Sequence, residues 1–379
     1  MKTQRSLANP LFRRNTLLPL ALAAAACLIL GPNAANAGFF LGLGIEAGDT
    51  RSNAIDLSDD GTVVLGSDAA RAGQLWTEST GWQNILTSDD IPRAISGDGK
   101  VVVGQRDNDP SPTGTTWEPM RWTQAGGVDL LGFVNPSGSF GRAYDADSDG
   151  SVIVGQSNND AFRWVDGSPP VMAAIGSNRR TALGVNAAGD VVVGHDNGGP
   201  AWRWESGSGF TTINDLTGGT SSFALSVSND GAVVVGYAEN AGANDEAFRW
   251  KNGPITGLGD LPGGAFDSRA NDTNVNGDVV VGYGTTASGT EAFIWSQRYG
   301  GLRNLQEFLT IDRNIAVPTG WTLEEAVAVS ADGGIVLGTG TNPDGQTEAF
   351  LAVIPEPASA MMLGVGGLLA ARRRRVRRG

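Results

Sequence analysis

The sequence predicts an all-β protein, a β-propeller of seven four-stranded blades closed by an N-terminal strand. Three observations carry this prediction. A short Val-rich segment ending in Gly occurs seven times, a turn ending in Gly precedes each copy, and an aromatic strand follows each copy. The copies recur every 38 to 56 residues. This period fits propeller blades better than the shorter coils of a β-solenoid.

The first 37 residues have the pattern of a secretory signal peptide. Four basic residues and no acidic ones precede a long apolar run, and small residues lead to Ala37. We therefore expect cleavage between Ala37 and Gly38, and export of the chain. A lipoprotein signal at Cys27 is the alternative. It fits less well, because Ala24 stands where such signals carry Leu.

The segment 39–44, with the sequence Phe-Phe-Leu-Gly-Leu-Gly, looks like the Leu-bearing fourth strand of a repeat. The last repeat lacks this strand, because an apolar run and an Arg cluster follow soon after its segment 348–354. We therefore predict that 39–44 pairs with the last repeat, which would join both ends of the domain in one sheet and remove an exposed edge. A frayed N-terminal extension is the alternative.

The seven Val-rich segments lie in a repeat array from 38 to 354. Asp-Gly or Asn-Gly precedes six of them and Ala-Gly precedes the other. Such dipeptides between short β-branched runs indicate tight β-hairpins, because the turn requires positive φ angles. The segments are 63–66, 101–104, 152–155, 191–194, 233–236, 279–282 and 335–338.

A strand of the form Ala-Phe-x-Trp follows each hairpin, and a Gly-rich turn, a Leu-bearing strand and a strand of small residues come next. One such sheet cannot bury both of its faces alone. We therefore expect the apolar residues, including the six repeated Trp, to pack between neighbouring blades. The aromatic strands are 161–164, 247–250 and 292–295, weaker copies ending at Trp76, Trp122 and Trp204, and a seventh without Trp at 349–352.

The array 38–354 is similar to the HAF-type extracellular repeat. It follows the pattern of that repeat throughout: Leu-Gly, a small-residue strand, Asx-x-Gly, Val-Val-Gly and Ala-Phe-x-Trp. Departures are an acidic turn at 145–149, a long loop at 105–116, and an insertion at 306–324 that is expected to hold one short helix. The resemblance implies export and a repeat fold, and it implies no particular reaction.

The C-terminal 25 residues resemble the PEP-CTERM sorting signal, in which a Pro-Glu-Pro triplet precedes an apolar run and an Arg cluster. The resemblance implies recognition by exosortase, a transient stay in the inner membrane, and a final place at the cell surface. The 14-residue run spans about 21 Å as a helix against roughly 30 Å of hydrocarbon, so it is a poor permanent anchor. A permanent single-pass anchor is the alternative. The motif residues are Pro355, Glu356, Pro357, Arg372, Arg373, Arg374 and Arg375.

The negative charge of the exported chain disfavours anionic partners. The two terminal signals contain ten of the 27 Lys and Arg residues. The segment 38–371 contains the other 17 basic residues and all 40 acidic residues. The net charge there is near −23, which disfavours nucleic acid and anionic membrane surfaces. The single Cys leaves with the signal peptide, so no disulfide or thiolate metal site is expected.

Calcium is the only cofactor that the sequence suggests. Asp145, Asp147 and Asp149 form a DxDxDG run whose alternating carboxylates could converge on a hard cation. The segment 272–277 is a looser candidate of the same kind. Asp and Asn are also ordinary turn residues, so a purely structural role competes with calcium binding at both places.

No catalytic residues are predicted. His195 is the only histidine, and no nucleophile or orienting acid stands at a recognisable spacing from it. The pairs 324–325 and 245–246 could suggest a glycosidase, but adjacent strand residues point to opposite faces. Carboxylates from different blades could still meet at the central channel.

The sequence therefore favours a non-enzymatic protein of the cell surface or extracellular matrix, whose propeller binds a surface protein or an exopolysaccharide. Because PEP-CTERM systems tend to accompany exopolysaccharide production, the glycan partner is implied by resemblance. A secreted carbohydrate-active enzyme, a hydrolase or lyase with carboxylates at the channel, is one alternative. A purely structural spacer is the other.

Overall fold

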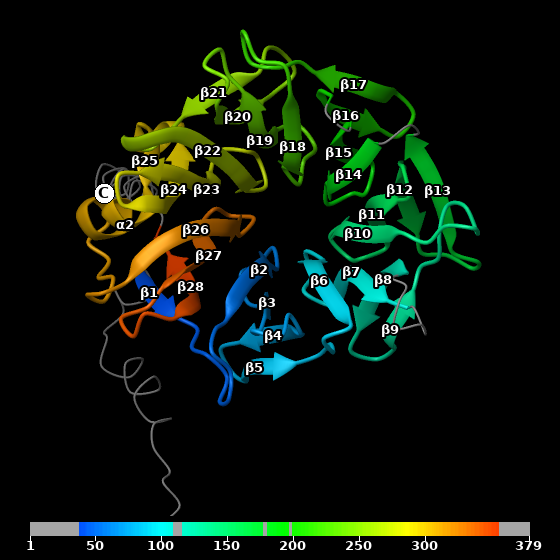
Figure 1. Cartoon of the computed structure of the whole chain (residues 1–379), viewed down its shortest axis with the longest axis horizontal. Coiled ribbons are helices and arrows are strands. Elements are labelled where there is room, and N and C mark those ends of the chain that lie inside the picture. Colours follow the sequence, from blue (N-terminus) through cyan, green and yellow to red (C-terminus); the bar gives the residue numbers. More distant parts are fainter. Residues whose placement is uncertain (1–37, 109–115, 177–179, 197–198, 356–379) are drawn as a thin grey trace, which may run out of the picture. The chain divides into compact units, whose positions relative to one another are not determined.

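The computed structural model describes residues 38–355 except 109–115, 177–179 and 197–198. These residues form seven four-stranded antiparallel sheets arranged in a ring (Figure 1). The ring confirms the predicted seven-bladed β-propeller.

Each of the first six blades consists of four strands that follow one another along the chain, from an inner strand at the centre of the ring to an outer strand at its edge (Figure 1). The strands of blades 1 to 6, in order, are β2 (Asn53–Leu57), β3 (Val64–Ser67), β4 (Gly73–Thr77) and β5 (Gly81–Asn84); β6 (Asp90–Ile95), β7 (Val101–Asp107), β8 (Trp117–Thr123) and β9 (Gly127–Leu130); β10 (Gly141–Ala146), β11 (Val152–Ser157), β12 (Asp160–Val165) and β13 (Val171–Gly176); β14 (Arg180–Val185), β15 (Val191–Asp196), β16 (Ala201–Glu205) and β17 (Gly209–Ile213); β18 (Ser222–Val227), β19 (Val234–Glu239), β20 (Asp245–Trp250) and β21 (Thr256–Gly259); and β22 (Gly263–Thr273), β23 (Val280–Thr286), β24 (Gly289–Ser296) and β25 (Gly301–Asn304).

Blade 7 is built from both ends of the described chain. Its first three strands are β26 (Thr322–Val329), β27 (Ile335–Thr341) and β28 (Thr347–Val353), and its outer strand is β1 (Phe39–Gly42). β1 runs antiparallel to β28, with Phe39 opposite Val353 (Figure 1). This pairing confirms the prediction that the N-terminal segment supplies the missing strand and closes the ring.

A tight hairpin joins the inner strand of each blade to the second strand. Its Gly has a φ between 68° and 76° in all seven blades, as the predicted turns require. The same Gly lies against a Val or Ile of the preceding blade: an added Cβ at Gly277 would stand 2.4 Å from Cβ of Val233. The hairpin therefore needs Gly both for its backbone and for close packing of the blades.

Every inner strand contains a bulge, where one extra residue interrupts the pairing with the second strand. The bulge bends the strand and changes the direction of the residue that follows it. The residues after the bulge are Asp56, Ala94, Asp145, Gly184, Ser226, Asp272 and Ala328, from blade 1 to blade 7.

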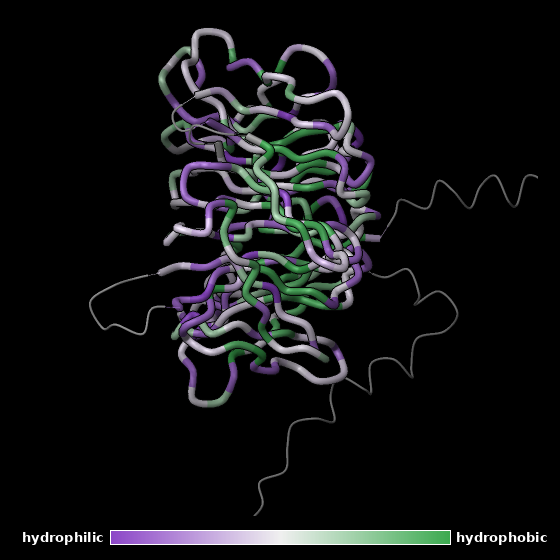
Figure 2. Tube along the Cα trace, turned by 90° about the vertical axis from the view of Figure 1, so that its right-hand side faces the viewer, coloured by the Kyte–Doolittle hydropathy of each residue, from purple (hydrophilic) through white to green (hydrophobic). Residues whose placement is uncertain are grey.

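The hydrophobic core lies between the blades, as predicted. The buried apolar residues described here form seven clusters, and each cluster joins two neighbouring blades. Trp164, for example, packs in the cluster of blades 2 and 3, and Trp250 in the cluster of blades 4 and 5. Figure 2 shows hydrophobic residues in the middle of the blades and hydrophilic ones along the turns.

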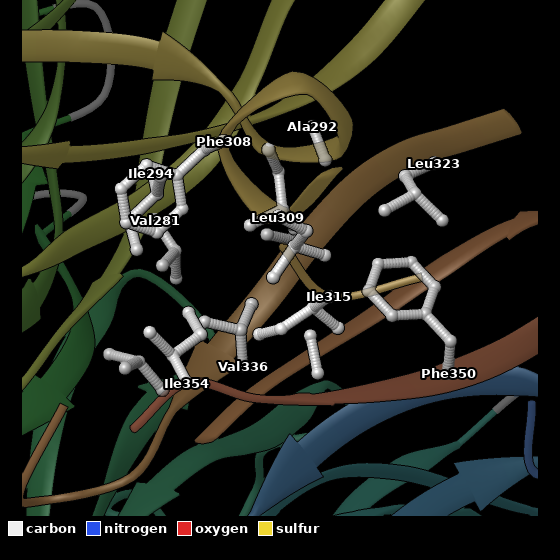
Figure 3. Packing of buried hydrophobic residues seen from close by; sticks show 14 of the residues in the cluster. Val281, Ala292, Ile294, Phe308, Leu309, Ile315, Leu323, Val336, Phe350 and Ile354 are labelled. Atoms are coloured by element: carbon white, nitrogen blue, oxygen red, sulfur yellow. The ribbon is translucent and has the colours of Figure 1, made fainter. Parts of the chain in front are cut away.

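The predicted helix in the insertion is confirmed as a short helical segment. It consists of α2 (Leu305–Glu307) and η3 (Phe308–Asp312), and another turn of helix, η2 (Gln297–Tyr299), precedes it. Phe308 and Leu309 are buried in the cluster between blades 6 and 7, which also includes Phe350 of β28 and Val336 of β27 (Figure 3). The insertion thus contributes to the core between blade 6 and blade 7, the blade formed by both ends of the described chain.

The predicted signal peptide and the sorting signal beyond Pro355, including Glu356, Pro357 and the Arg cluster, lie outside the described residues. Within the described part of the chain, no helix is long and apolar enough to cross a membrane.

Candidate functional site

The inner strands surround a central channel whose two ends differ. At one end, hereafter the hairpin end, backbone hydrogen bonds join neighbouring hairpins. The Asp59 N–H donates to the Gly97 oxygen and the Ala331 N–H donates to the Asp59 oxygen, each at 2.8 Å. The amide of Asn229, in blade 5, also donates to the Asp59 carboxylate of blade 1 at 3.0 Å. This contact links blades that are not neighbours, so the hairpin end is narrow.

Three aspartates, Asp56, Asp145 and Asp272, face the channel just inside the hairpin end. Each occupies the position after the bulge of its inner strand. Each carboxylate also accepts a backbone N–H from the next blade, so the aspartates act as links between blades. The donors are Ile95 at 2.8 Å, Val185 at 2.8 Å and Val329 at 2.9 Å.

The next blade makes room for each of these carboxylates. At the position after its own bulge that blade has only Ala or Gly: Ala94 beyond Asp56, Gly184 beyond Asp145, and Ala328 beyond Asp272. Large and small residues thus alternate around the channel. Ser226 fills the remaining position, and its hydroxyl donates to the Asp272 carboxylate at 2.8 Å.

Enclosure raises the pKa of the three carboxyl groups. Burial, opposed by the N–H donors, raises the pKa of Asp56 to about 7 and that of Asp272 to about 6. The pKa of Asp145 is also well above its ordinary value, because of burial first and the charge of Asp56 second. Near neutral pH the three groups therefore resist being charged together.

At this level the channel is a polar cavity of about 90 Å³, lined by the three aspartates and the adjoining hairpins. This volume holds several water molecules, and it is well below the roughly 300–1,000 Å³ of small-ligand sites.

The predicted calcium ligands Asp145, Asp147 and Asp149 have separate partners. Asp145 faces the channel, Asp147 accepts the N–H of Val152 at 2.9 Å, and Asp149 accepts the N–H of Ser151 at 3.0 Å. In the described chain, no group of three or more His, Cys, Asp or Glu side chains is placed to hold a metal ion. The arrangement explains these acids as turn and channel residues and adds no support for calcium.

The looser candidate, 272–277, is divided in the same way. Asp272 faces the channel, and Asn274 accepts the N–H of Val279 at 3.0 Å. Asn276 accepts the N–H of Asp278 at 3.2 Å. These asparagines therefore shape the hairpin.

The other end of the channel, hereafter the rim, carries one cross-strand pair from each blade. The pair joins the start of the inner strand to the residue after the repeated Gly of the second strand. The hairpin positions are nearly the same in all blades, whereas these pairs all differ. From blade 1 to blade 7 they are Asn53 with Ser67, Ile91 with Gln105, Arg142 with Gln156, Thr181 with His195, Phe223 with Tyr237, Arg269 with Tyr283, and Glu325 with Thr339.

An aromatic and cationic ladder runs along the rim across blades 4, 5 and 6. The ring of His195 lies 4.7 Å from that of Phe223, which stacks on Tyr237 at 4.7 Å. The Arg269 guanidinium lies 4.3 Å from the centre of the Tyr237 ring, and it also donates to Asp245 at 2.8 Å. The ladder thus ends in a charged pair.

Burial keeps His195 and two rim tyrosines, Tyr237 and Tyr283, neutral over a wide pH range. It lowers the pKa of His195, against the opposing effect of Asp196, and it raises the pKa of Tyr283 to about 12. His195 therefore packs as an aromatic ring against Phe223.

The paired carboxylates of the sequence do not act as pairs. Glu324 accepts the Thr341 hydroxyl at 2.6 Å, whereas Glu325 accepts the Asn271 amide of the neighbouring blade at 2.8 Å. The pair 245–246 is split likewise, since only Asp245 binds Arg269. Adjacent residues point to opposite faces, as predicted.

The sequence analysis did not single out Asp56 or the ladder. A signal existed: when the seven repeats are aligned on the hairpin Gly, the position five residues before it is Asp in three blades and a small residue in the other four. The ladder has no such signal, because its members come from three blades far apart in the chain.

No family model and no curated protein matches the sequence. Solved structures resemble the fold at low identity. The β-propeller domain of the Trilobed protease from Pyrococcus furiosus has a TM-score of 0.51 and 13% identity, over 79% of this chain and 95% of that one. That domain has an open velcro topology. Here β1 closes the ring, so the likeness concerns the blades and not the closure.

Two further propellers are more distant. TolB from Acinetobacter baumannii has a TM-score of 0.38 and 17% identity over 66% of this chain, which spans only 53% of that protein. The Swd1 propeller domain from Myceliophteria thermophila has a TM-score of 0.48 and 10% identity, over 81% of this chain and 97% of that one.

Proposed function

We propose that the chain is an exported, non-enzymatic propeller of the cell surface or extracellular matrix, which binds an exopolysaccharide or a surface protein through its rim. Export rests on the pattern of residues 1–37. Recognition by exosortase and transient anchoring in the inner membrane rest on the resemblance of residues 355–379 to a sorting signal. The strongly acidic array argues against nucleic acid as a partner.

One observation carries the binding role. The seven blades repeat almost unchanged at the hairpin end but differ from one another at the rim, where aromatic, cationic, anionic and amide side chains alternate. A scaffold requires the repeated positions only. A set of different side chains around one opening is what recognition of a polar, extended ligand requires, because each blade then contributes a distinct contact.

A glycan is the preferred partner because the rim combines aromatic surface with many hydrogen-bonding groups. Arg93, which donates from Nε to the rim residue Gln105 at 3.1 Å, lies 4.9 Å over the ring of Tyr144, and the Arg269 guanidinium covers Tyr237. The hydroxyl and guanidinium groups suit the hydroxyls of sugars, and their mutual contacts hold them in place before a ligand arrives.

The enzyme alternative has an observation in its favour, since three aspartates with raised pKa values meet at the channel. Two features favour the binding role over it. Each carboxylate already accepts a backbone N–H from the neighbouring blade, and the adjoining cavity of about 90 Å³ is far smaller than the roughly 300–1,000 Å³ of small-ligand sites. A glycosidase needs its acids in contact with the sugar.

Replacing Tyr237 tests the proposed rim site. Tyr237→Leu keeps an apolar contact with Phe223 but removes the hydroxyl and the ring beneath Arg269, so we expect about tenfold weaker binding of the producer's exopolysaccharide, equivalent to about 1.4 kcal/mol. Val171→Ala is the control, because Val171 is exposed on the outer strand β13. Equal affinity of both variants and the parent chain would rule out the rim as the binding surface.

A further inference from the structure

A second polar recess lies on the hairpin side of the ring, between blades 5 and 6, away from the rim. Arg249 is the last residue but one of β20, the third strand of blade 5, and Trp295 and the turn after it belong to blade 6. The recess has a volume of about 410 Å³, within the range of small-ligand sites. Its lining residues are Arg249, Asp278, Trp295, Ser296, Gln297 and Arg298.

Arg249 is fixed in this recess by its blade contacts. Its Nε donates to the oxygen of Gly277, the hairpin glycine of blade 6, at 2.8 Å. Its guanidinium lies 5.8 Å from the centre of the Trp295 ring. Both contacts leave the two terminal nitrogens free to donate elsewhere, so the side chain presents a pre-oriented fork.

The same repeat position in another blade shows what Arg249 lacks. Arg203 also donates from Nε to the hairpin Gly of the next blade, at 3.1 Å, but its terminal nitrogen is paired with Glu205 at 2.9 Å. Two residues after Arg249 the chain has Lys251 in place of that glutamate. In the described chain Arg249 makes no salt bridge, and the charge that acts on it is that of Asp278, which lines the same recess.

The rest of the recess adds donors and one acceptor. The Arg298 side chain is 62% exposed, and its guanidinium stands 3.6 Å from the carboxylate of Asp278, which also lines the recess. Gln297 is exposed beside it. Two guanidinium groups and one carboxylate leave a local excess of positive charge on a chain that is otherwise strongly acidic.

We propose that this recess binds an acidic sugar residue, such as a uronate, of a polysaccharide. The carboxylate of the sugar pairs with the fork of Arg249 and with Arg298, its hydroxyls donate to Asp278 and accept from Gln297, and its ring lies beside Trp295. A sugar acid fits better than an acidic peptide, because the recess offers an acceptor for hydroxyl groups next to its cations. The inference rests on the proposed glycan-binding function and names the class of glycan.

The test is calorimetric titration of the purified full chain with tetragalacturonate and with its methyl ester, which has the same rings without the charges. We expect tetragalacturonate to bind and the ester to bind at least tenfold more weakly. Arg249→Met should weaken tetragalacturonate binding at least tenfold, and Arg298→Gln severalfold. Arg203→Met is the matched control, because it loses the same Nε bond to a hairpin Gly, and it should leave the affinity unchanged.

Three results would overturn the inference. If tetragalacturonate does not bind while the producer's polysaccharide still binds and depends on Tyr237, the recess assignment fails and the rim proposal stands. If neither binds, the proposed function fails as well. If a polyglutamate peptide binds as tightly as tetragalacturonate and is equally sensitive to Arg249→Met, the recess recognises peptide carboxylates and not a sugar acid.

Discussion

At the scale of single residues, the channel aspartates show how one repeat position can serve two purposes. Asp56 and its two counterparts link adjacent blades through backbone N–H groups, and they gather three acids in one enclosed space. The link stabilises the ring while the enclosure disfavours the charged carboxylates. A change of pH distinguishes the two effects, because it alters the charge of the carboxyl groups.

The folded chain should therefore become less stable as the pH rises from about 4 to about 7. The pKa of Asp56 is about 7 in the folded chain against an ordinary value of 3.8, so the folded state holds more protons than the unfolded state across this interval. Its contribution to stability is complete below the ordinary value and is lost as the pH rises through the folded pKa. Asp272 acts in the same direction up to about pH 6.

Thermal melts of the parent chain and of Asp56→Asn between pH 4 and pH 8 isolate this effect. The variant has no charge at this position at any pH, so the difference in Tm between the two proteins should change in its favour as the pH rises. Parallel curves would show that Asp56 ionises normally in the folded chain.

At the scale of the element, the hairpins explain why the fold was readable from the sequence. Each hairpin Gly has a positive φ and lies against the preceding blade, so two independent constraints maintain the same residue in every copy. The closing strand was predictable for a related reason, since the last repeat visibly lacked one strand. The bulges were not predictable, because their residues vary and only the pairing register reveals them.

Gly277→Ala and Gly207→Ala separate the two constraints. Gly207 has a φ of 89° and nothing within 4 Å of an added Cβ, whereas Gly277 has a φ of 72° and Val233 at 2.4 Å. We expect Gly207→Ala to cost about 1 to 2 kcal/mol for the backbone alone, and Gly277→Ala to cost clearly more. Urea unfolding of both variants measures this, and equal losses would mean that the contact between blades is unimportant.

Site prediction was harder at this scale. The sequence located the acids at 145–149 and left calcium binding and a turn role open for them, because it gives no view of their separate directions. In the folded chain the bulge turns Asp145 toward the channel while Asp147 caps its hairpin. Neighbours in sequence thus serve different surfaces. The rim ladder depends on contacts between blades, such as that of His195 with Phe223, which no local pattern encodes.

At the scale of the whole molecule, closure by β1 joins the two ends of the described chain. Removal of residues 38–42 should lower the Tm strongly and promote self-association, because the edge of β28 would be exposed. Size-exclusion chromatography with thermal melts checks this. The control is Phe39→Ser with Leu41→Ser, which changes two outward side chains, 51% and 37% exposed, and keeps the pairing of the strand. A truncated chain as stable and monomeric as the parent would contradict the closure role.

The ring separates a scaffold end from a variable end. The hairpin end is tied together by hydrogen bonds between blades, and the rim displays a different pair of side chains from each blade. Such a division suits a protein that presents a recognition surface on a rigid support. The proposed binding role predicts that the polysaccharide is not cleaved.

The most direct measurement is to incubate the purified chain with the exopolysaccharide of the producing organism and to record both binding and the length of the polysaccharide chains. The account predicts saturable binding, weakened by Tyr237→Leu, with no change in chain length. Shortening of the polysaccharide would contradict it and would identify an enzyme, with the channel acids Asp56, Asp145 and Asp272 as the first residues to replace.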